Sequence, residues 1–517
     1  MKQYTRILFA ILILSAIASP SFAQQNTFST NLFTAGINDG SNAVIENSAG
    51  NYLVAGFSYS GSNSDIYLSE INNSGNLLQS AVIGSASYEI PRCLLQAAGG
   101  YYIVAGSIYD SPSDNDWFIT KLDNAFNIVW FKRMGATGGN DYANSCFEVS
   151  PNHFVFTGTV GLSGSAKPSV VMIDSSGTVI HEGYMTTNQF ASPNYRGRYL
   201  GNGEIGFANL ANSISILDTT GNIVKQGSFS IATFTRDVVS APNGGYAVCG
   251  VFGYGSPSGS SLAFGVCDNN LTSLSFAYRY SLSGYDVQPV MMHRDAAGKY
   301  VIAVNAFSLS SGNALPLVVI LDSAGTFLSA RSYLPAGSGN ITLNSLIPTS
   351  DGGYLIAGGT GISSFVAKLD AAGGSCSAIN LNFATTTINQ LSASPHSLYS
   401  GNVSILASPV AIGVFGGVNS NLNCSSSTGI EILEPAHNQI KLYPSLFKDG
   451  FYISQDNGSK ESVNVTLYEI TGRKVADLKT SGDAYISTPG LASGTYFVRV
   501  TDRNGAILFK GKAICAN

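Results

Sequence analysis

Three aspartates close together in the sequence are the first residues that could bind an ion. Asp110, Asp114 and Asp116 lie within the stretch DSPSDNDW, and carboxylates at such short spacing can bind Ca²⁺. However, Asp65 precedes a predicted strand in the same way as Asp116, which indicates that these side chains organise loops. We therefore predict no metal site and no cofactor.

Three further carboxylates, those of Asp141, Asp237 and Asp286, could act on a substrate. Two carboxylates about 5–10 Å apart can cleave a glycosidic bond. Each of the three can instead cap a loop by accepting backbone N–H groups, and we favour this interpretation. The sequence contains no Gly-x-Ser-x-Gly, His-Glu-x-x-His or phosphate-loop motif, and its 5 histidines are scattered. We therefore assign no catalytic residue, and the ligand-binding residues are unknown at this point.

The 7 cysteines are an odd number, so at least one thiol is unpaired within the chain. We expect a disulfide between Cys376 and Cys424, which flank a segment without repeats. In the chain-entropy model this bond would contribute about 4 kcal/mol of stability. Two further disulfides are open alternatives, one between Cys93 and Cys146 and one between Cys249 and Cys267. Of these four cysteines, all except Cys93 align with apolar core positions of the repeat. No Cys-x-x-Cys spacing supports zinc or redox chemistry.

The composition favours strands and tight turns. Only 11% of the residues are charged and 57 are Gly, whereas a helical protein would carry more Glu, Lys, Arg and Ala. The net charge of −5 is small for 517 residues. Because no basic run is present to pair with phosphates, nucleic acid is not an expected partner.

Residues 1–23 have the pattern of a secretory signal peptide. Lys2 and Arg6 form a positive region, residues 7–18 are apolar, and residues 21–23 form a small-x-small cleavage site. No later segment reaches the roughly 20 apolar residues that a membrane span needs. We expect the mature chain to begin near Gln24, outside the cytoplasm and without a transmembrane segment.

A stretch of aromatic, aliphatic and small residues that ends in Gly recurs along the chain. Examples are GYYIVAGS from Gly100 and DGGYLIAGG from Asp351. The copies are spaced by about 50 residues, which is within the range of propeller blades. Their anchor positions are Gly56, Gly106, Gly158, Asn209, Gly250, Val304 and Gly358.

At three positions of the aligned copies, the recurring residue type has a structural reason. Six residues before the anchor, every copy has Gly except the third, which has Asn152; this predicts a hairpin turn with positive φ. Four residues before the anchor stand large side chains such as Tyr52, which can fill the space between stacked sheets. The residue directly before the anchor is small, as in Ala55, which indicates close packing.

A second predicted strand follows each copy and ends in an acid or amide that can form an Asx turn. These residues are Asn72, Asp123, Asp174, Asp218, Asp268, Asp322 and Asp370. A third strand then leaves the turn, so each unit is a four-stranded meander once the strand before the anchor is included. A single sheet cannot bury both faces, and stacking repeated sheets in a ring solves this problem. We predict an all-β fold with a seven-bladed β-propeller over residues 24–376, and a β-helix is the alternative.

The ends of the ring can be predicted as well. Residues 27–39 have the pattern of a last strand without the rest of its repeat. We expect them to complete the blade begun by residues 345–370, and residues 377–384 are the competing segment.

The repeats resemble those of a family of secreted Bacteroidetes propellers, over about residues 27–376. The motifs that carry the resemblance are residues 351–358, residues 116–123 with their pattern Asp-Trp-x-x-x-Lys-Leu-Asp, Trp130, and Gly139 to Asp141. The copies anchored at Asn209 and Val304 depart from the family pattern. The resemblance implies the propeller fold and export from the cell.

Residues 436–517 contain short alternating strands separated by turns, which predict a small Ig-like β-sandwich. This stretch resembles the C-terminal sorting domain of the type IX secretion system. The matching residues are Tyr443, Pro444, Gly472, Lys474, Gly494, Tyr496, Val498, Arg499, Lys510 and Lys512. The family motif Tyr-Pro-Asn-Pro is here Tyr-Pro-Ser-Leu, and Cys515 is unusual. An ordinary terminal sandwich is the alternative, and residues 377–435 are expected to be a connector.

The sorting-domain resemblance implies partners and a destination. These are the type IX secretion machinery, a sortase-like protease that removes the domain, and secretion or attachment to the outer face of the outer membrane. We predict a non-catalytic propeller that binds a glycan or a surface protein. The alternatives are a secreted polysaccharide hydrolase or lyase with carboxylates at the central opening, and a purely structural envelope protein.

Overall fold

The computed structural model describes residues 26–515 with interruptions. The residues left out are 34–38, 61–62, 110–114, 136–138, 163–164, 187–195, 210–212, 230–231, 233, 334–339, 361–362, 377, 388–392, 396–398, 402–405, 409–412, 416–418, 428–439, 444–445, 456–461, 470–472, 482 and 504–506. The expected signal peptide, Asp110 and Asp114 therefore lie outside the described residues. The chain divides into two compact units, residues 1–428 and 429–517, and each is described by itself.

The first unit consists of antiparallel strands that form seven sheets among the described residues. We call them blades 1 to 7 in chain order. Blades 1 to 3 contain β2 (Asp39–Glu46), β3 (Tyr52–Ser60), β4 (Asn63–Ile71) and β5 (Leu77–Gly84); β6 (Tyr88–Gln96), β7 (Tyr102–Tyr109), β8 (Asn115–Leu122) and β9 (Ile128–Gly135); and β10 (Tyr142–Ser150), β11 (His153–Leu162), β12 (Ser165–Asp174) and β13 (Val179–Thr186).

The remaining blades repeat this order. Blades 4 to 6 contain β14 (Gly197–Gly201), β15 (Glu204–Asn209), β16 (Ser213–Asp218) and β17 (Ile223–Phe229); β18 (Phe234–Ser240), β19 (Tyr246–Phe252), β20 (Ser261–Cys267) and β21 (Leu274–Ser281); and β22 (Tyr285–Arg294), β23 (Tyr300–Ser308), β24 (Ala314–Leu321) and β25 (Phe327–Tyr333). Blade 7 contains β26 (Thr342–Pro348), β27 (Tyr354–Gly359), β28 (Ser364–Leu369) and β1 (Asn26–Phe33).

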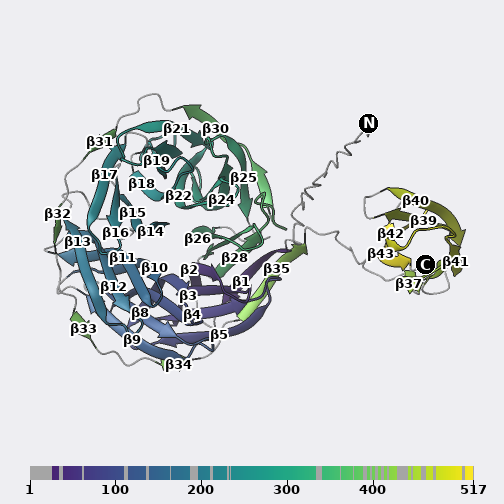
Figure 1. The fold of residues 1–517 in the computed structure, drawn as a ribbon, viewed down its shortest axis with the longest axis horizontal. Helices are drawn as coiled ribbons and strands as arrows, with labels where there is room; N and C mark the ends of the chain where they lie inside the picture. Colours follow the sequence, from purple (N-terminus) through teal and green to yellow (C-terminus); the bar gives the residue numbers. More distant parts are fainter. Residues whose placement is uncertain are drawn as a thin grey trace, which may run out of the picture. The chain divides into compact units, whose positions relative to one another are not determined.

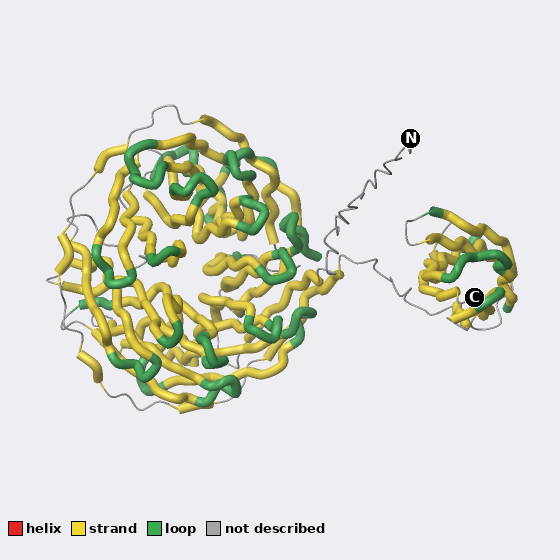
Figure 2. The backbone as a smooth tube through the Cα atoms, viewed as in Figure 1, coloured by secondary structure: helices red, strands yellow, loops and turns green. Residues whose placement is uncertain are grey.

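The blades form a closed ring. The first strand of each blade contacts the first strand of the next, from β2 through β6, β10, β14, β18 and β22 to β26, and β26 contacts β2. Figure 1 shows β2, β10, β14, β18, β22 and β26 around the centre, with later strands such as β5, β13 and β17 toward the rim. Figure 2 shows strands joined by short turns throughout the ring. The first unit is therefore a β-propeller.

The repeated sequence columns explain why the blades form and stack. The turn position has positive φ in every copy, from 64° at Asn152 to 85° at Gly352. The large residues four positions before the anchors are all buried. Two of the tyrosines among them also bond the preceding blade: Tyr246 Oη donates to Glu204 at 2.8 Å, and Tyr354 Oη donates to Asp295 at 2.9 Å. The predicted Asx turns are present, as in Asp174, whose Oδ1 accepts the N–H of Ser176.

The N-terminal strand closes the ring. β1 pairs with β28 in antiparallel register, with Phe28 opposite Lys368 and Leu32 opposite Ser364. Phe28 and Leu32 are fully buried. The competing segment lies elsewhere, because its strand β29 (Ala378–Leu381) pairs with β25 of blade 6. The prediction that residues 27–39 complete the last blade is thus confirmed for β1.

The expected connector forms a belt around the propeller. It adds one outer strand to every blade, in the order of blades 6, 5, 4, 3, 2, 1 and 7. These strands are β29, β30 (Ala384–Thr387), β31 (Ala393–Pro395), β32 (Tyr399–Gly401), β33 (Leu406–Ser408), β34 (Gly413–Phe415) and β35 (Asn419–Ser427). The belt therefore runs backward relative to the chain order of the blades, and its strands lie on the outside of the ring in Figure 1.

A disulfide joins the two ends of the belt. Cys376 lies just before β29 and Cys424 lies in β35, and their sulfurs are bonded across a sequence separation of 48. Since the strands between them visit all the blades, the bond closes a covalent hoop around the propeller. Cys93, Cys146, Cys249 and Cys267 are free thiols, so neither alternative bridge is formed.

The second unit is a sandwich of two sheets. One sheet contains β36 (Ile440–Tyr443), β38 (Gly450–Gln455) and β41 (Ala484–Ser487); the other contains β37 (Leu446–Phe447), β43 (Ile507–Cys515), β42 (Gly494–Thr501), β39 (Ser462–Glu469) and β40 (Lys474–Ser481). Phe451 and Ile486 from the first sheet share a buried core with Val465 and Val498 from the second. The alternating pattern of the tail produces this core, because every second side chain of a strand faces the opposite sheet.

Candidate binding site in the central channel

The first strands of the blades carry a repeated β-bulge. In blade 2, Pro91 pairs with Gly106 and Cys93 pairs with Ala105, so Arg92 is an extra residue with no partner in the ladder. The same shift occurs opposite the anchor in five more blades. The extra residues there are Asn42, Asn144, Arg236, Val290 and Asn344.

The bulge explains why the anchor is so often glycine. A Cβ placed on Gly106 would lie 2.0 Å from the carbonyl oxygen of Ile90, two residues before the bulged Arg92. A Cβ on Gly358 would lie 1.8 Å from the carbonyl oxygen of Thr342. No side chain fits at such distances. The bulged backbone that lies against the column therefore explains its glycines, while blade 6 accommodates Val304 opposite its own bulge.

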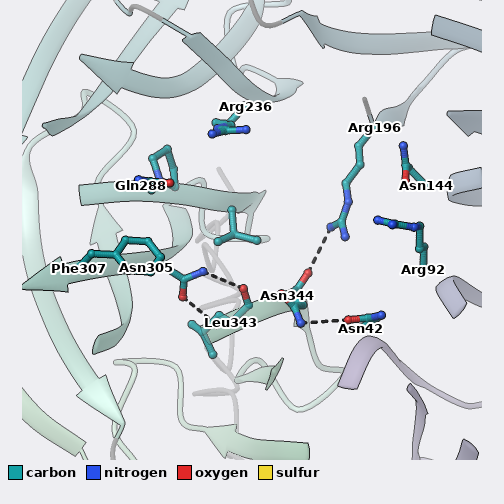
Figure 3. Close-up of a pocket in the computed structure, with 12 residues that line it drawn as sticks. Asn42, Arg92, Asn144, Arg196, Arg236, Gln288, Asn305, Phe307, Leu343 and Asn344 are labelled. Carbon is teal, nitrogen blue, oxygen red and sulfur yellow. Dashed lines mark hydrogen bonds between the residues drawn. The ribbon is translucent and has the colours of Figure 1, made fainter. Parts of the chain in front are cut away.

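The bulged residues point into the central channel. Together with Arg196, which directly precedes β14 of blade 4, they line a cavity of about 270 Å³ that we call the first cavity. Because its lining comes from the innermost part of all the blades, the cavity lies on the axis of the ring. Figure 3 shows Arg92, Arg196 and Asn144 on one side and Arg236 and Gln288 on the other.

The first cavity is strongly positive. Arg92, Arg196 and Arg236 line it, and its described lining includes no Asp or Glu. Nε of Arg92 and Nε of Arg236 are buried without a hydrogen-bond partner. Burial lowers the pKa of the Arg92 guanidinium, and the nearby charge of Arg196 lowers it further. Burial is also the main cause that lowers the pKa of Arg196 and of Arg236.

Amide groups hold the rest of the first cavity in place. Asn344 donates from Nδ2 to the carbonyl oxygen of Ser41 and to Oδ1 of Asn42, both at 3.0 Å. Asn42 donates from Nδ2 to the carbonyl oxygen of Pro91 at 2.8 Å. These bonds link blades 7, 1 and 2. Asn42 and Asn344 therefore join neighbouring blades as well as lining the channel.

A second cavity, of about 280 Å³, shares Asn42, Arg92, Asn144 and Arg196 with the first. Its own charged groups are paired. Arg198 donates to Asp237 at 3.0 Å from Nε and at 2.6 Å from Nη2, and Asp237 also accepts the N–H of Met292 at 2.7 Å. Arg198 Nη1 lies 3.3 Å from Nε2 of His293. Burial, followed by the charge of Arg198, keeps the pKa of His293 well below its usual value.

Two thiols also line the second cavity, those of Cys93 and Cys146. Burial raises the pKa of Cys146, and a hydrogen bond with Cys93 raises it further. The two thiols are therefore neighbours, as the sequence register suggests, and Cys146 is held in its neutral form.

The carboxylates considered from the sequence have structural partners. Asp141 is fully buried and its Oδ1 accepts the N–H of Gly161 at 2.6 Å. Asp286 Oδ1 accepts the N–H of Ser260 at 2.7 Å. Asp116 forms an ion pair with Arg133 at 2.6 Å. Among Asp141, Asp237 and Asp286, only Asp237 lines one of the two channel cavities, and it forms an ion pair with Arg198.

The residues of the first cavity are not among the site residues predicted from the sequence. A signal for them exists, because each bulged residue stands fourteen positions before its anchor, as Asn42 does before Gly56 and Arg92 before Gly106. This column contains three Asn, two Arg and one Val across the six bulged blades. A long polar side chain at a fixed place within a buried strand is the pattern to look for.

The residues of the predicted sorting motif lie in the second unit. Tyr496 and Val498 are buried in its core, and Tyr496 Oη donates to the carbonyl oxygen of Ala492 at 2.8 Å. Lys474 pairs with Asp477 at 2.7 Å, and the guanidinium of Arg499 lies over the ring of Tyr468. Lys510 pairs with Arg499 in the backbone ladder and Lys512 pairs with Phe497. Tyr443 ends β36 and Gly494 begins β42, whereas Pro444 and Gly472 lie outside the described residues.

The strand order defines the class of protein, an all-β propeller followed by a separate small β-unit. A family model described as a secretion system C-terminal sorting domain matches residues 441–512, within that second unit. The chain is therefore a propeller protein with a type IX secretion sorting tail, and it is secreted and attached to the cell surface. The tail implies an interaction with the secretion machinery.

Solved structures that resemble the chain include three other proteins. One is a protein of unknown function from Bacteroides caccae, with 12% identity over 58% of this chain and 92% of that chain and a TM-score of 0.32. Another is PorZ, a surface component of the type IX secretion system of Porphyromonas gingivalis, with 12% identity over 90% of this chain and 69% of that chain and a TM-score of 0.31. The third is Sqt1 from Chaetomium thermophilum, with 10% identity over 66% of this chain and 99% of that chain and a TM-score of 0.41.

None of the curated proteins compared matches this sequence. Across the described ranges of residues 26–515, no helix has the length and apolar character that crossing a bilayer would require.

Proposed function

We propose that this chain is an exported, non-catalytic binding protein whose propeller holds its ligand at the first cavity. The observation that carries the proposal is the state of the arginines there. Arg198, in the second cavity, is paired with Asp237, as a structural arginine in a buried channel should be. Arg92 and Arg236, in contrast, keep buried donor nitrogens without partners.

Unpartnered buried donors are costly, so proteins keep them chiefly where function needs them. A ligand that accepts hydrogen bonds from Arg92 and Arg236 would remove this cost. The sorting tail supports the place of action, which is the outer surface of the cell. We further propose that residues 1–23 are removed on export, that the chain crosses the outer membrane of a Bacteroidetes-type cell, and that a sortase-like protease cleaves before the tail.

A binding screen tests the proposal. The chain from Gln24 to Asn517 is presented to a glycan array and to isolated surface proteins of the producing cell, and bound ligands are quantified by titration. Binding that is saturable and weakened by a substitution of Arg236 supports the function. Release of shorter saccharides from a polysaccharide would instead support the hydrolase alternative, and the absence of any ligand would overturn the proposal.

A further inference from the structure

We infer that the ligand of the first cavity is an acidic sugar of a glycan, held through its carboxylate or sulfate oxygens by Arg236 and Arg92. This inference rests on the proposed binding function and adds the chemical class of the ligand. The charge of the cavity, the unpartnered donors of its arginines and the groups beside Arg236 support it.

The charge of the first cavity selects an anion. Three guanidinium groups converge there, and the described lining includes no carboxylate. The charge of Asp237, which lines the adjoining second cavity, acts on Arg196. Charges in a channel with low-dielectric walls are screened far less than charges on an open surface. A cationic or neutral group would leave the repulsion between the arginines in place. An oxyanion would neutralise part of it.

The donor geometry selects oxygen acceptors on a compact group. A guanidinium presents its N–H donors in a rigid plane that matches two oxygens of one carboxylate or sulfate. Nε of Arg236 is buried and has no hydrogen-bond partner among the described residues. Arg92 also keeps its Nε unpartnered, while its guanidinium lies 4.9 Å from the centre of the Tyr142 ring, which fixes its direction.

The neighbours of Arg236 select a sugar. Gln288 of β22 and Phe307 of β23 line the same side of the cavity as Arg236, and both are partly exposed to the channel. An amide can both donate to and accept from hydroxyl groups. An aromatic ring offers an apolar face to the C–H groups of a pyranose. A guanidinium, an amide and an aromatic ring together match a hydroxylated ring that carries an anion.

The experiment is a calorimetric titration of the chain from Gln24 to Asn517 with four probes. They are a galacturonate oligosaccharide, a sulfated galactose oligosaccharide, the neutral galactose oligosaccharide, and oligoglutamate of matched charge. Arg236→Gln and Arg92→Gln are compared with Arg294→Gln, a matched control at an exposed arginine at the end of β22. Melting temperatures and circular dichroism check that each variant is folded.

We expect one of the two acidic oligosaccharides to bind and the neutral one not to bind. Arg236→Gln and Arg92→Gln should each weaken that binding on the order of tenfold or more, while Arg294→Gln leaves it unchanged. The two acidic probes distinguish a carboxylate from a sulfate. Arg236→Lys, which keeps the charge without the planar fork, should bind more weakly than the wild type and more tightly than Arg236→Gln.

Three results would overturn the inference. Equal binding of neutral and acidic oligosaccharides would show that the site does not recognise an anionic group. Binding of oligoglutamate alone would show that the site does not recognise a sugar. Binding of an acidic oligosaccharide that both arginine variants retain would move the site away from the first cavity. Each of these leaves the binding function standing, whereas a protein that binds nothing in the wider screen would end both.

Discussion

Arg196 donates a hydrogen bond from Nη1 to the backbone carbonyl oxygen of Asn344 at 3.2 Å. Arg196 precedes β14 of blade 4 and Asn344 lies in β26 of blade 7, and these blades are not neighbours in the ring. The bond therefore crosses the channel, as Figure 3 shows. It holds a third positive charge near the axis, close enough to Arg92 to lower the pKa of that guanidinium.

Replacement of Arg236 should stabilise the empty propeller. Arg236→Gln removes a partly buried charge and its buried, unpartnered Nε, so we expect the free energy of unfolding to rise by about 1 kcal/mol. Arg294→Gln, at an exposed position, should change it by less than about 0.5 kcal/mol. Urea unfolding of both variants measures the difference. A loss of stability in Arg236→Gln would mean that this arginine serves the fold.

Two glycines of one repeat should respond very differently to alanine. In Gly106→Ala the new Cβ would lie 2.0 Å from the carbonyl oxygen of Ile90 and 2.8 Å from Cα of Pro91, and both of these are backbone atoms. We expect a loss of about 3 kcal/mol or more. Gly100 has a φ of 84° but open space around it, so Gly100→Ala should cost only about 1 kcal/mol. Similar losses in the two variants, measured by chemical denaturation, would contradict the account of the anchor.

Much of the propeller could be predicted because its signals are local and repeated. A glycine or asparagine at each turn, such as Asn152, has one physical reason, and that reason recurs in every copy. The closing strand β1 could be placed because it lacks the rest of its repeat. A strand pattern and the residues of its turns can be recognised from residues that are close together in the sequence.

The belt and the binding site were harder to predict. The strands β31 to β34 are three residues long, and such short segments carry no periodic pattern. They form strands only because each blade offers them an unpaired outer edge. Arg92 and Arg236 read as ordinary polar positions in the sequence, since their common orientation depends on a bulge that is created by pairing. Asp237 is a candidate catalytic carboxylate in the sequence alone, because its partner Arg198 lies 39 positions away.

Removal of the hoop's disulfide should destabilise the propeller. The double variant Cys376→Ser with Cys424→Ser opens a loop with a sequence separation of 48, and the chain-entropy model gives a loss of about 4 kcal/mol. Cys249→Ser, at a buried free thiol of β19, is the control for cysteine replacement as such. In the double variant, the rate of amide hydrogen exchange should increase most in the outer strands of the blades. An unchanged unfolding midpoint in the double variant would show that the belt holds without its bond.

The ion pair of Lys368 and Asp351 should make the stability of blade 7 depend on acid pH. Lys368 has a fully buried side chain, and its Nζ lies 2.9 Å from a carboxylate oxygen of Asp351. Burial raises the pKa of Asp351, but hydrogen bonds from Thr349 and Lys368 together outweigh it and bring the pKa below its usual value. A carboxyl with a lowered pKa stabilises the fold at pH values above its unfolded pKa of about 3.9, and this contribution is lost as the pH falls below that value.

Asp351→Asn tests this pair, because it leaves the ammonium of Lys368 buried without its counter-charge. We expect a loss of about 3 kcal/mol at pH 7 and a smaller loss at pH 3, where the wild type has itself lost part of the contribution. Glu204→Gln is the control, since its partner Lys225 is partly exposed and the pair should contribute less than about 1 kcal/mol. Unfolding curves between pH 3 and pH 7 measure both variants. If the Asp351→Asn loss were the same at every pH in this range, the pair would stabilise the blade through packing, because an electrostatic contribution must decline as the carboxylate is protonated.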